Sequence, residues 1–322
     1  MSPTPLERLA AYRAPRWLVG GHAQTLWAAT APMWQAPLPS WQRTRWPTPD
    51  GDFVDVDWLG GATSSGPLLV LLHGLEGSSR SPYAAQLARQ AVQRGWRLAV
   101  PHFRGCSGEP NRTARAYHAG DVVEVAWFLT RLRAHAPGGL WVVGVSLGGN
   151  ALLRWAAEYG EAAARQVTAL AAVCAPLDLA ACGGALARGL SRWLYTPWFL
   201  RTMKAKAAVH ARRHPDSFDV RRALAARSLA AFDDAFTAPL HGFAGVADYW
   251  ARASAGPHLA AIRVPALVLN PLNDPFVPTA SLPRVTGPWV QACRPAHGGH
   301  VGFVGAGPWS FLCDWLVQPG HG

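Results

Sequence analysis

The sequence contains little lysine, few acidic residues and no long apolar run. Thirty of its 322 residues are Lys or Arg and 19 are Asp or Glu, which gives a formal net charge of +11 at pH 7. Lys204 and Lys206 are the only lysines, so arginine carries nearly all of the positive charge. Because the arginines are spread along the chain and no recognised nucleic-acid-binding module accompanies them, we do not expect nucleic acid to be a partner.

Membrane-spanning and secretory segments are also missing. No apolar run approaches the roughly 18 residues of a transmembrane helix. Arg13, Arg16, His22 and Gln24 interrupt the apolar residues near the N-terminus, so no signal peptide is predicted. The five cysteines are an odd number and include no C-x-x-C pair. These patterns favour reduced thiols and a cytoplasmic location over a disulfide framework.

Motifs for nucleotide cofactors and metals are absent or incomplete. Neither a Walker A sequence nor G-x-G-x-x-G stands at a predicted strand-helix turn, so we expect no cofactor. His210 and His214 have the spacing of two metal ligands on a helix, but arginines lie between them where a metalloprotease has its glutamate. A solvated basic face explains this pair better than a metal site. Cys106 lies in a glycine-bounded loop, and no neighbour in the sequence predicts an activated thiolate.

Apolar strands alternate with amphipathic helices along most of the chain, in which 50% of the residues are hydrophobic. This alternation predicts an α/β fold, with a mostly parallel central sheet and helices on both of its faces. An antiparallel hairpin is expected at one edge, and alternation of apolar and acidic residues predicts that its second strand is half-buried. The predicted hairpin strands are residues 41–46 and 53–58, and the predicted buried strands are residues 68–72, 97–101, 140–143, 167–174, 265–270 and 289–293.

The alternation stops between residues 175 and 257, where the sequence is helical and rich in arginine. We predict an inserted helical cap over residues 175–257. The cap divides an α/β core formed by residues 1–174 and 258–322, and residues 1–50 form an N-terminal arm without clear periodicity.

Three aromatic residues of the predicted cap, Trp193, Trp198 and Phe199, are candidates for substrate binding. They are expected either to line an apolar pocket or to pack the cap onto the core, and the sequence favours neither over the other.

The sequence Gly144-Val145-Ser146-Leu147-Gly148 joins a predicted buried strand to a predicted helix. A G-x-S-x-G motif in this context is typical of a nucleophile elbow, in which flanking glycines let the backbone close around a strained serine. Chance occurrence in a glycine-rich protein is the alternative, and the flanking strand and helix argue against it. We therefore predict that Ser146 is an exposed nucleophile at the carboxyl edge of the sheet.

A serine hydroxyl needs a general base and an orienting carboxylate to act as a nucleophile. The expected chain order is serine, acid, histidine, and Asp274 and His300 follow the last two predicted strands in that order. Asp178, one strand earlier, is the alternative acid, and Asp274 could instead form an ordinary turn before proline. His297 is the alternative base, but the glycines around His300 favour a close approach of the backbone there.

The oxyanion of the reaction intermediate needs backbone donors. We predict the N–H groups of Leu147, which follows the serine, and of Leu75, in the loop after the 68–72 strand.

These motifs together resemble the YheT-like branch of the α/β-hydrolase superfamily. The resemblance extends from near the start of the chain to near its end. It implies a metal-independent serine hydrolase, a carboxylesterase, with Ser146 as nucleophile, Asp274 as acid and His300 as base. The segments that carry it are Gly21-His22-Ala23-Gln24-Thr25, His73-Gly74-Leu75-Glu76-Gly77-Ser78-Ser79, Phe103-Arg104-Gly105-Cys106-Ser107-Gly108, Gly144-Val145-Ser146-Leu147-Gly148-Gly149-Asn150, Asn273-Asp274-Pro275-Phe276 and Gly298-Gly299-His300-Val301-Gly302-Phe303.

The chain departs from this branch in two respects. Leu272 and Asn273 stand where a second acidic residue often precedes the catalytic one, and the N-terminal membrane anchor of eukaryotic relatives is not found. The expected substrate is a small-molecule or lipid-like ester, with peripheral membrane contact through the basic cap as a further expectation. An acyltransferase that uses the same residues, or a non-catalytic lipid-binding protein on the same fold, are the alternatives.

Overall fold

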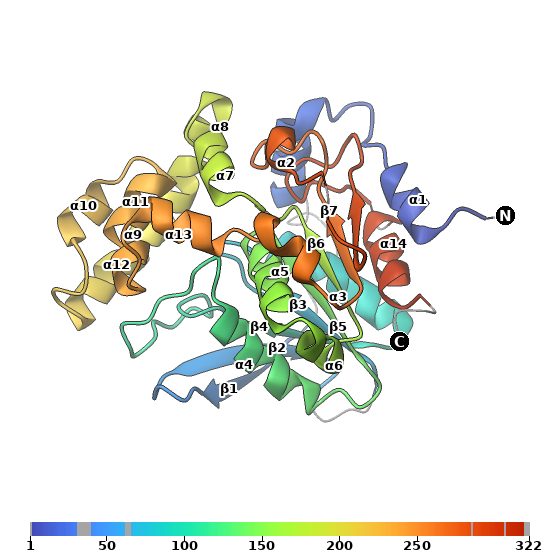
Figure 1. The fold of residues 1–322 in the computed structure, drawn as a ribbon, viewed down its shortest axis with the longest axis horizontal. Coiled ribbons are helices and arrows are strands. Elements are labelled where there is room, and N and C mark those ends of the chain that lie inside the picture. Colours follow the sequence, from blue (N-terminus) through green and yellow to red (C-terminus); the bar gives the residue numbers. More distant parts are fainter. Residues whose placement is uncertain (1, 31–39, 62–65, 285, 306, 319–322) are drawn as a thin grey trace.

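The computed structural model describes residues 2–30, 40–61, 66–284, 286–305 and 307–318. Eight strands form one sheet in the order β1-β2-β4-β3-β5-β6-β7-β8 (Figure 1). β1 and β2 pair in antiparallel fashion, as do β2 and β4, whereas the strands from β4 to β8 in this order run parallel. The predicted α/β-hydrolase architecture is confirmed. The strands are β1 (Gln42–Pro47), β2 (Phe53–Leu59), β3 (Leu68–Leu72), β4 (Arg97–Pro101), β5 (Leu140–Val145), β6 (Ala169–Val173), β7 (Ala266–Leu269) and β8 (Val290–Cys293).

The order of the parallel strands creates a switch point beside β3. The chain leaves β3 toward β4 on one side and then returns to form β5 on the other side of β3. Loops that follow two such strands diverge to opposite faces of the sheet and leave a crevice at their carboxyl ends. Ser146 directly follows β5, and the loop with Leu75 follows β3, so both lie at this crevice.

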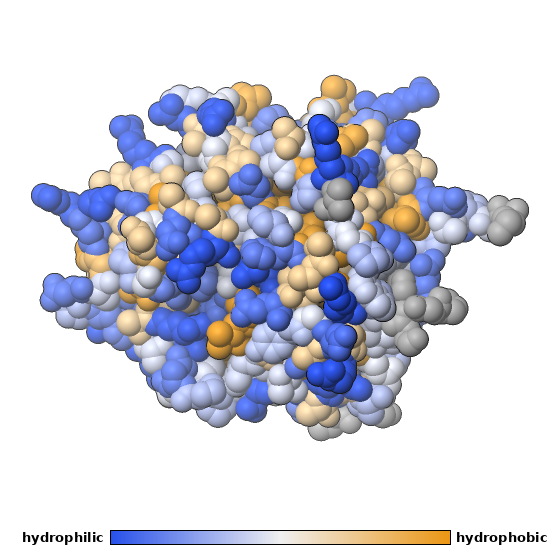
Figure 2. All heavy atoms as spheres, viewed as in Figure 1, coloured by the Kyte–Doolittle hydropathy of each residue, from blue (hydrophilic) through white to orange (hydrophobic). Residues whose placement is uncertain are grey.

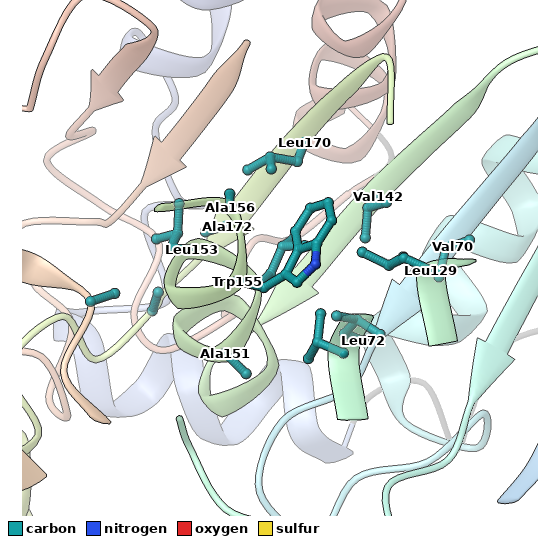
Figure 3. Packing of buried hydrophobic residues seen from close by; sticks show 14 of the residues in the cluster. Val70, Leu72, Leu129, Val142, Ala151, Leu153, Trp155, Ala156, Leu170 and Ala172 are labelled. Carbon is teal, nitrogen blue, oxygen red and sulfur yellow. The ribbon is translucent and has the colours of Figure 1, made fainter. Parts of the chain in front are cut away.

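Helices cover both faces of the sheet (Figure 1). The apolar core on one face includes side chains of α4 (Val122–Arg133) and α5 (Leu147–Tyr159), and the short α6 (Glu161–Gln166) follows. Figure 3 shows Trp155 extending from α5 toward Val142 and Leu170 of the sheet. The core on the other face includes side chains of α1 (Pro5–Ala10), α3 (Pro82–Arg94) and α14 (Gly307–Leu316). Short 3-10 helices flank β7 at Gly256–Ala261 and Thr279–Ser281.

A group of helices lies between β6 and β7 in the sequence and to one side of the sheet in space (Figure 1). No described helix is both long enough and apolar enough to cross a bilayer. The boundaries of the predicted cap and core stay predictions. The helices of this group are α7 (Leu179–Leu186), α8 (Gly189–Leu194), α9 (Thr196–Arg213), α10 (Val220–Ala225), α11 (Leu229–Ala235), α12 (Thr237–Leu240) and α13 (Val246–Ala253).

The described part of the N-terminal arm contains the helices α1 and α2 (Gly20–Thr30), although its sequence lacks a clear helical period. One local prediction needs correction. β2 is buried on both faces, and not half-buried, because Asp55 and Asp57 form bidentate ion pairs with Arg45 and Arg43 of β1. A buried carboxylate is tolerated when it is paired in this way.

Candidate active site

Ser146 lies in a tight turn between β5 and α5. Its backbone has φ 51° and ψ −120°, a conformation that side-chain-bearing residues rarely adopt. The flanking glycines make the turn possible, because a Cβ at Gly148 would lie 2.4 Å from the carbonyl oxygen of Leu72. A Cβ at Gly144 would similarly lie 2.6 Å from the carbonyl oxygen of Gly148. The G-x-S-x-G sequence thus forms the strained elbow that its pattern predicts.

The structure brings Ser146, His300 and Asp274 into one hydrogen-bonded chain. The Nε2 atom of His300 lies 3.0 Å from Ser146 Oγ, and its Nδ1 atom lies 2.9 Å from Asp274 Oδ2. Asp274 Oδ1 also accepts hydrogen bonds from the amides of Phe276 and Val277, and its side chain is fully buried. These bonds hold the carboxylate where it orients the imidazole, whose Nε2 then faces the serine hydroxyl.

The alternative acid and base lie elsewhere. Asp178 is exposed and caps α7, where its side chain accepts a hydrogen bond from the amide of Ala181. The Nδ1 atom of His297 is buried without a hydrogen-bond partner among the described residues. Neither residue takes part in the hydrogen-bonded chain at Ser146.

Gln24 of α2 joins the loops that carry the acid and the histidine. Its Oε1 atom accepts hydrogen bonds from the Gly298 amide, at 2.8 Å, and from Asn273 Nδ2, at 3.0 Å. Its Nε2 atom donates to the carbonyl of Leu18, so every polar atom of this buried side chain has a partner. Asn273 Oδ1 in turn accepts from the amide of Gly299. One glutamine and one asparagine thereby fix the spacing of the two loops.

Thr25 holds the backbone of His300 itself. Its hydroxyl accepts a hydrogen bond from the His300 amide at 2.8 Å and donates one to the carbonyl of Gly21. The fit is close, since a Cβ at Gly299 would lie 2.6 Å from the Gly21 carbonyl oxygen. Local sequence patterns do not indicate these roles of Gln24 and Thr25. The only signal in the sequence is the resemblance of residues 21–25 to the YheT-like branch.

The loop after β3 lies directly beside Ser146. A Cβ at Gly74 would lie 3.2 Å from the Cβ atom of Ser146, so a side chain at this position would crowd the serine. Within the described residues, the amides of Leu75 and Leu147 donate no hydrogen bond. Leu147 is the first residue of α5, where free N–H groups and the helix dipole favour negative charge.

Glu76 fixes this loop from its other side. It has φ 57°, and its amide donates a hydrogen bond to the hydroxyl of Tyr117. Its buried carboxylate accepts hydrogen bonds from Tyr117 Oη at 2.7 Å and from Lys206 Nζ at 2.8 Å. Lys206 also lies 3.3 Å from the thiol of Cys106, whose pKa burial raises to about 11, so this cysteine is a neutral thiol.

A buried polar group supports the start of the same loop. His73 accepts a hydrogen bond from the amide of Phe103 at Nε2, and its Nδ1 atom donates to the carbonyl of Gly74. Burial lowers the pKa of His73 to about 3, so the imidazole is neutral. His102 packs against His73 and bonds Asp57 of β2 at 2.9 Å. His73, in its neutral form, thus connects the loop after β3 with the loop after β4.

A cavity of about 430 Å³ opens from Ser146 toward the helices between β6 and β7. Phe199 lines it, which is one of the two alternatives left open by the sequence, and Phe276 stacks on the His300 ring with the ring centroids 4.1 Å apart. Trp193 and Trp198 do not line it: they are 72% and 54% exposed, because α8 and the start of α9 turn these positions outward. A role of these two tryptophans in substrate binding stays a prediction. Apolar groups contribute most of the surface of its lining, and the apolar lining residues include Leu75, Leu147, Leu179, Leu186, Met203 and Phe232.

Two groups of side chains are close enough to be considered as metal ligands. Ligand atoms of Cys174, Asp274 and His300 lie within 4.8 Å of one another. The carboxylate and imidazole already bond each other, and burial raises the pKa of the Cys174 thiol well above its usual value, which disfavours the thiolate that binds metals. The rings of His210 and His214 lie 4.9 Å apart, and among the described residues no third side chain completes a metal site with them.

Comparisons with known proteins agree with the fold. The sequence profile of the α/β hydrolase fold family matches residues 67–306. YheT of Escherichia coli (strain K12), whose name proposes an esterase, is 41% identical over 285 residues, which span 84% of this chain and 82% of YheT. Phospholipase ABHD3 of Mus musculus is 28% identical over 84% of this chain and 67% of its own length. The structure of a Pyrobaculum calidifontis esterase superposes with a TM-score of 0.55 at 17% identity and covers 95% of this chain and 94% of that one. The chain therefore belongs to the α/β-hydrolase family and, within it, to the YheT-like branch of esterase-type hydrolases.

Proposed function

We propose that this protein hydrolyses carboxylic esters through an acyl-enzyme intermediate on Ser146. The serine Oγ attacks the ester carbonyl carbon while Nε2 of His300 takes the hydroxyl proton. The histidine then gives that proton to the leaving alcohol as the carbon–oxygen bond breaks. A water molecule, deprotonated by the same histidine, releases the acid and restores the serine. Asp274 keeps the imidazole in the required tautomer and stabilises its protonated form.

The carbonyl oxygen becomes negatively charged in each tetrahedral intermediate. The N–H groups of Leu75 and Leu147 are the proposed donors to this oxygen. Both belong to residues that line the cavity beside Ser146, and neither amide has another acceptor in the described chain. Donors fixed in advance stabilise the developing charge without a reorganisation cost, which is commonly a large part of the rate enhancement.

The observation that supports this proposal best is the hydrogen-bonded chain from Ser146 through His300 to Asp274 at the wall of an apolar cavity. The lining favours an ester with an apolar acyl group over a charged one. The names of an esterase and a phospholipase among the relatives agree with this substrate class.

Labelling with a fluorophosphonate tests the nucleophile. We expect the wild-type protein to bind one equivalent of label and the Ser146→Ala protein to bind none. Hydrolysis of p-nitrophenyl esters of increasing acyl length then identifies the acyl specificity, with Ser146→Ala as the control. A folded wild-type protein that is neither labelled nor active on any of these esters would overturn the proposal.

A matched pair of aspartates tests the acid in the same assay. We expect Asp274→Asn to lower kcat by about four orders of magnitude, because it removes the charge that orients and stabilises the imidazole. Asp178→Asn keeps a side-chain oxygen that can cap α7, and we expect it to leave turnover within about twofold of wild type. The opposite ranking would assign the acid to the earlier strand.

A further inference from the structure

The surface formed by α2, the residues just before it, α8 and the start of α9 exposes an unusual number of large apolar side chains. Individual exposures range from 40% to 81%. Four of the eight side chains are tryptophans. Two of these, Trp17 and Trp27, contact each other edge to face, with their ring centroids 4.7 Å apart. We call this surface the tryptophan face. Its exposed apolar residues are Trp17, Val19, Leu26, Trp27, Leu190, Trp193, Leu194 and Trp198.

The two parts of the tryptophan face are adjacent in space although they are far apart in the sequence. His22 Nδ1 of α2 lies 3.1 Å from the hydroxyl of Tyr195, the residue between α8 and α9, and the two rings are stacked. Figure 2 shows hydrophobic side chains interspersed with hydrophilic ones along the upper edge of the molecule, where Figure 1 places α8 and α2.

The charge of this surface has one sign. The sequence has no aspartate or glutamate in residues 8–49 or in residues 179–215, the two stretches that supply the tryptophan face. Exposed arginines flank the apolar side chains, and in the part of the chain that the structure describes none of them pairs with a carboxylate. These arginines are Arg13, Arg16, Arg188, Arg192 and Arg201.

We propose that the tryptophan face docks the protein onto a bilayer that contains anionic phospholipids. Tryptophan side chains favour the boundary between acyl chains and headgroups, where the ring is apolar and its N–H remains hydrated. Unpaired arginines around such a patch are attracted to lipid phosphates, and an apolar patch without acidic residues avoids repulsion by them. The charge pattern therefore favours an anionic lipid surface over a neutral one, and over a second copy of this chain, whose net charge is also positive.

The docked orientation brings the membrane close to the cavity. The ring of Trp198 on the tryptophan face contacts the ring of Phe199, with their centroids 5.0 Å apart, and Phe199 lines the cavity. Phe199 contacts Phe276, which stacks on His300. A continuous run of aromatic rings thus connects the docking surface with the candidate active site. Docking itself does not require the proposed esterase activity.

Co-sedimentation with vesicles tests this proposal. The protein carries Ser146→Ala so that lipid hydrolysis cannot change the vesicles, and the vesicles are phosphatidylcholine alone or with about one third phosphatidylglycerol. We expect sedimentation with the anionic vesicles, weakened by added salt because screening reduces the attraction of arginine to phosphate. Replacing Trp193 and Trp198 together with alanine is expected to weaken binding at least about tenfold, through the loss of buried apolar area.

Trp289→Ala is the matched control. Trp289 is 45% exposed, but it precedes β8 and so lies at the amino ends of the parallel strands. The candidate site lies at their carboxyl ends. Its replacement should leave sedimentation unchanged, whereas Arg188→Gln with Arg192→Gln should reduce the dependence on salt. Failure to sediment with anionic vesicles would overturn the proposal. An equal loss of vesicle binding in Trp289→Ala and in the double variant of Trp193 and Trp198 would overturn it as well. A dimer in light scattering that Trp193→Ala with Trp198→Ala dissociates would instead assign the face to a second copy of the chain.

Discussion

The position of the His300 imidazole depends on side chains that never touch the serine. Gln24 Oε1 is the common acceptor for the amide of Gly298 and for Asn273 Nδ2, which lie on the two loops that must stay in register. A shift of about 1 Å between acid and base weakens proton transfer strongly, so such anchors control the rate without taking part in the chemistry.

We expect Gln24→Leu to lower kcat by about tenfold to a hundredfold with little change in KM. The leucine leaves the buried Gly298 amide without an acceptor, which costs about 1–3 kcal/mol and loosens the histidine loop. Gln93→Leu, at an exposed position of α3, is the control and should keep wild-type kinetics. Steady-state kinetics on a p-nitrophenyl ester would measure both, and equal kcat values would contradict the anchoring role.

The three residues of the hydrogen-bonded chain could be selected from the sequence because each follows a recognisable strand and lies in a glycine-bounded or proline-bounded turn. Gln24 could not, because its contact with Gly298 spans 274 positions and leaves no local pattern. The outward direction of Trp193 was equally hidden, since the phase of the six-residue α8 is set by packing and not by periodicity.

At the scale of elements, α9 connects the helices between β6 and β7 with the loop after β3. Lys206 reaches from α9 to the carboxylate of Glu76, next to the proposed oxyanion donor Leu75. The Glu76 carboxylate is 5% exposed and the Lys206 side chain 38% exposed, so screening by water reduces only part of their attraction.

We expect Lys206→Met to lower kcat about tenfold and the free energy of unfolding by about 1–3 kcal/mol. The methionine keeps the length of the side chain but leaves the buried carboxylate with Tyr117 as its remaining side-chain donor. Lys204→Met on the same helix is the control, because Lys204 has no ion pair in the described chain. Urea titration and ester kinetics would measure the two effects. The same loss for both lysines would contradict a specific role of the pair.

The sheet was predictable because buried parallel strands are continuous apolar runs between turn residues, as at Leu68–Leu72. The burial of β2 could not be predicted, because its aspartates alternate with apolar residues, which is the usual pattern of a strand with one exposed face. The arginines that neutralise these aspartates lie on another strand. The helix α2 could not be predicted, because its two starting glycines and mixed polarity give no clear helical period.

At the scale of the whole molecule, one buried and three half-buried neutral histidines make the fold sensitive to acid. Burial lowers the pKa of His73, His118 and His241 to about 3 and that of His210 to about 4, from about 6.5 in an unfolded chain. Between these values the unfolded chain binds more protons than the folded one. The stability these groups contribute is complete above about pH 6.5 and is lost as the pH falls toward their folded pKa values.

We expect the Tm to fall steadily between pH 7 and pH 4, measured by calorimetry at constant ionic strength. Burial raises the pKa of Asp233 to about 6 and that of Glu124 to about 7, which opposes this trend, but the histidines are more numerous and their pKa values are shifted further. His210→Phe should make the slope shallower, because its ring packs among Phe218 and Phe236 without needing a charge. A Tm that rises toward pH 4 would contradict this assignment.

The contact between Gln24 and Gly298 also has a consequence for the synthesis of the protein. A ribosome makes the chain from the N-terminus, so α2 is synthesised before every strand of the described sheet. The histidine loop follows β8 and is therefore synthesised after all of these strands. The hydrogen bond between Ser146 and His300 thus cannot form until the chain has been synthesised past β8.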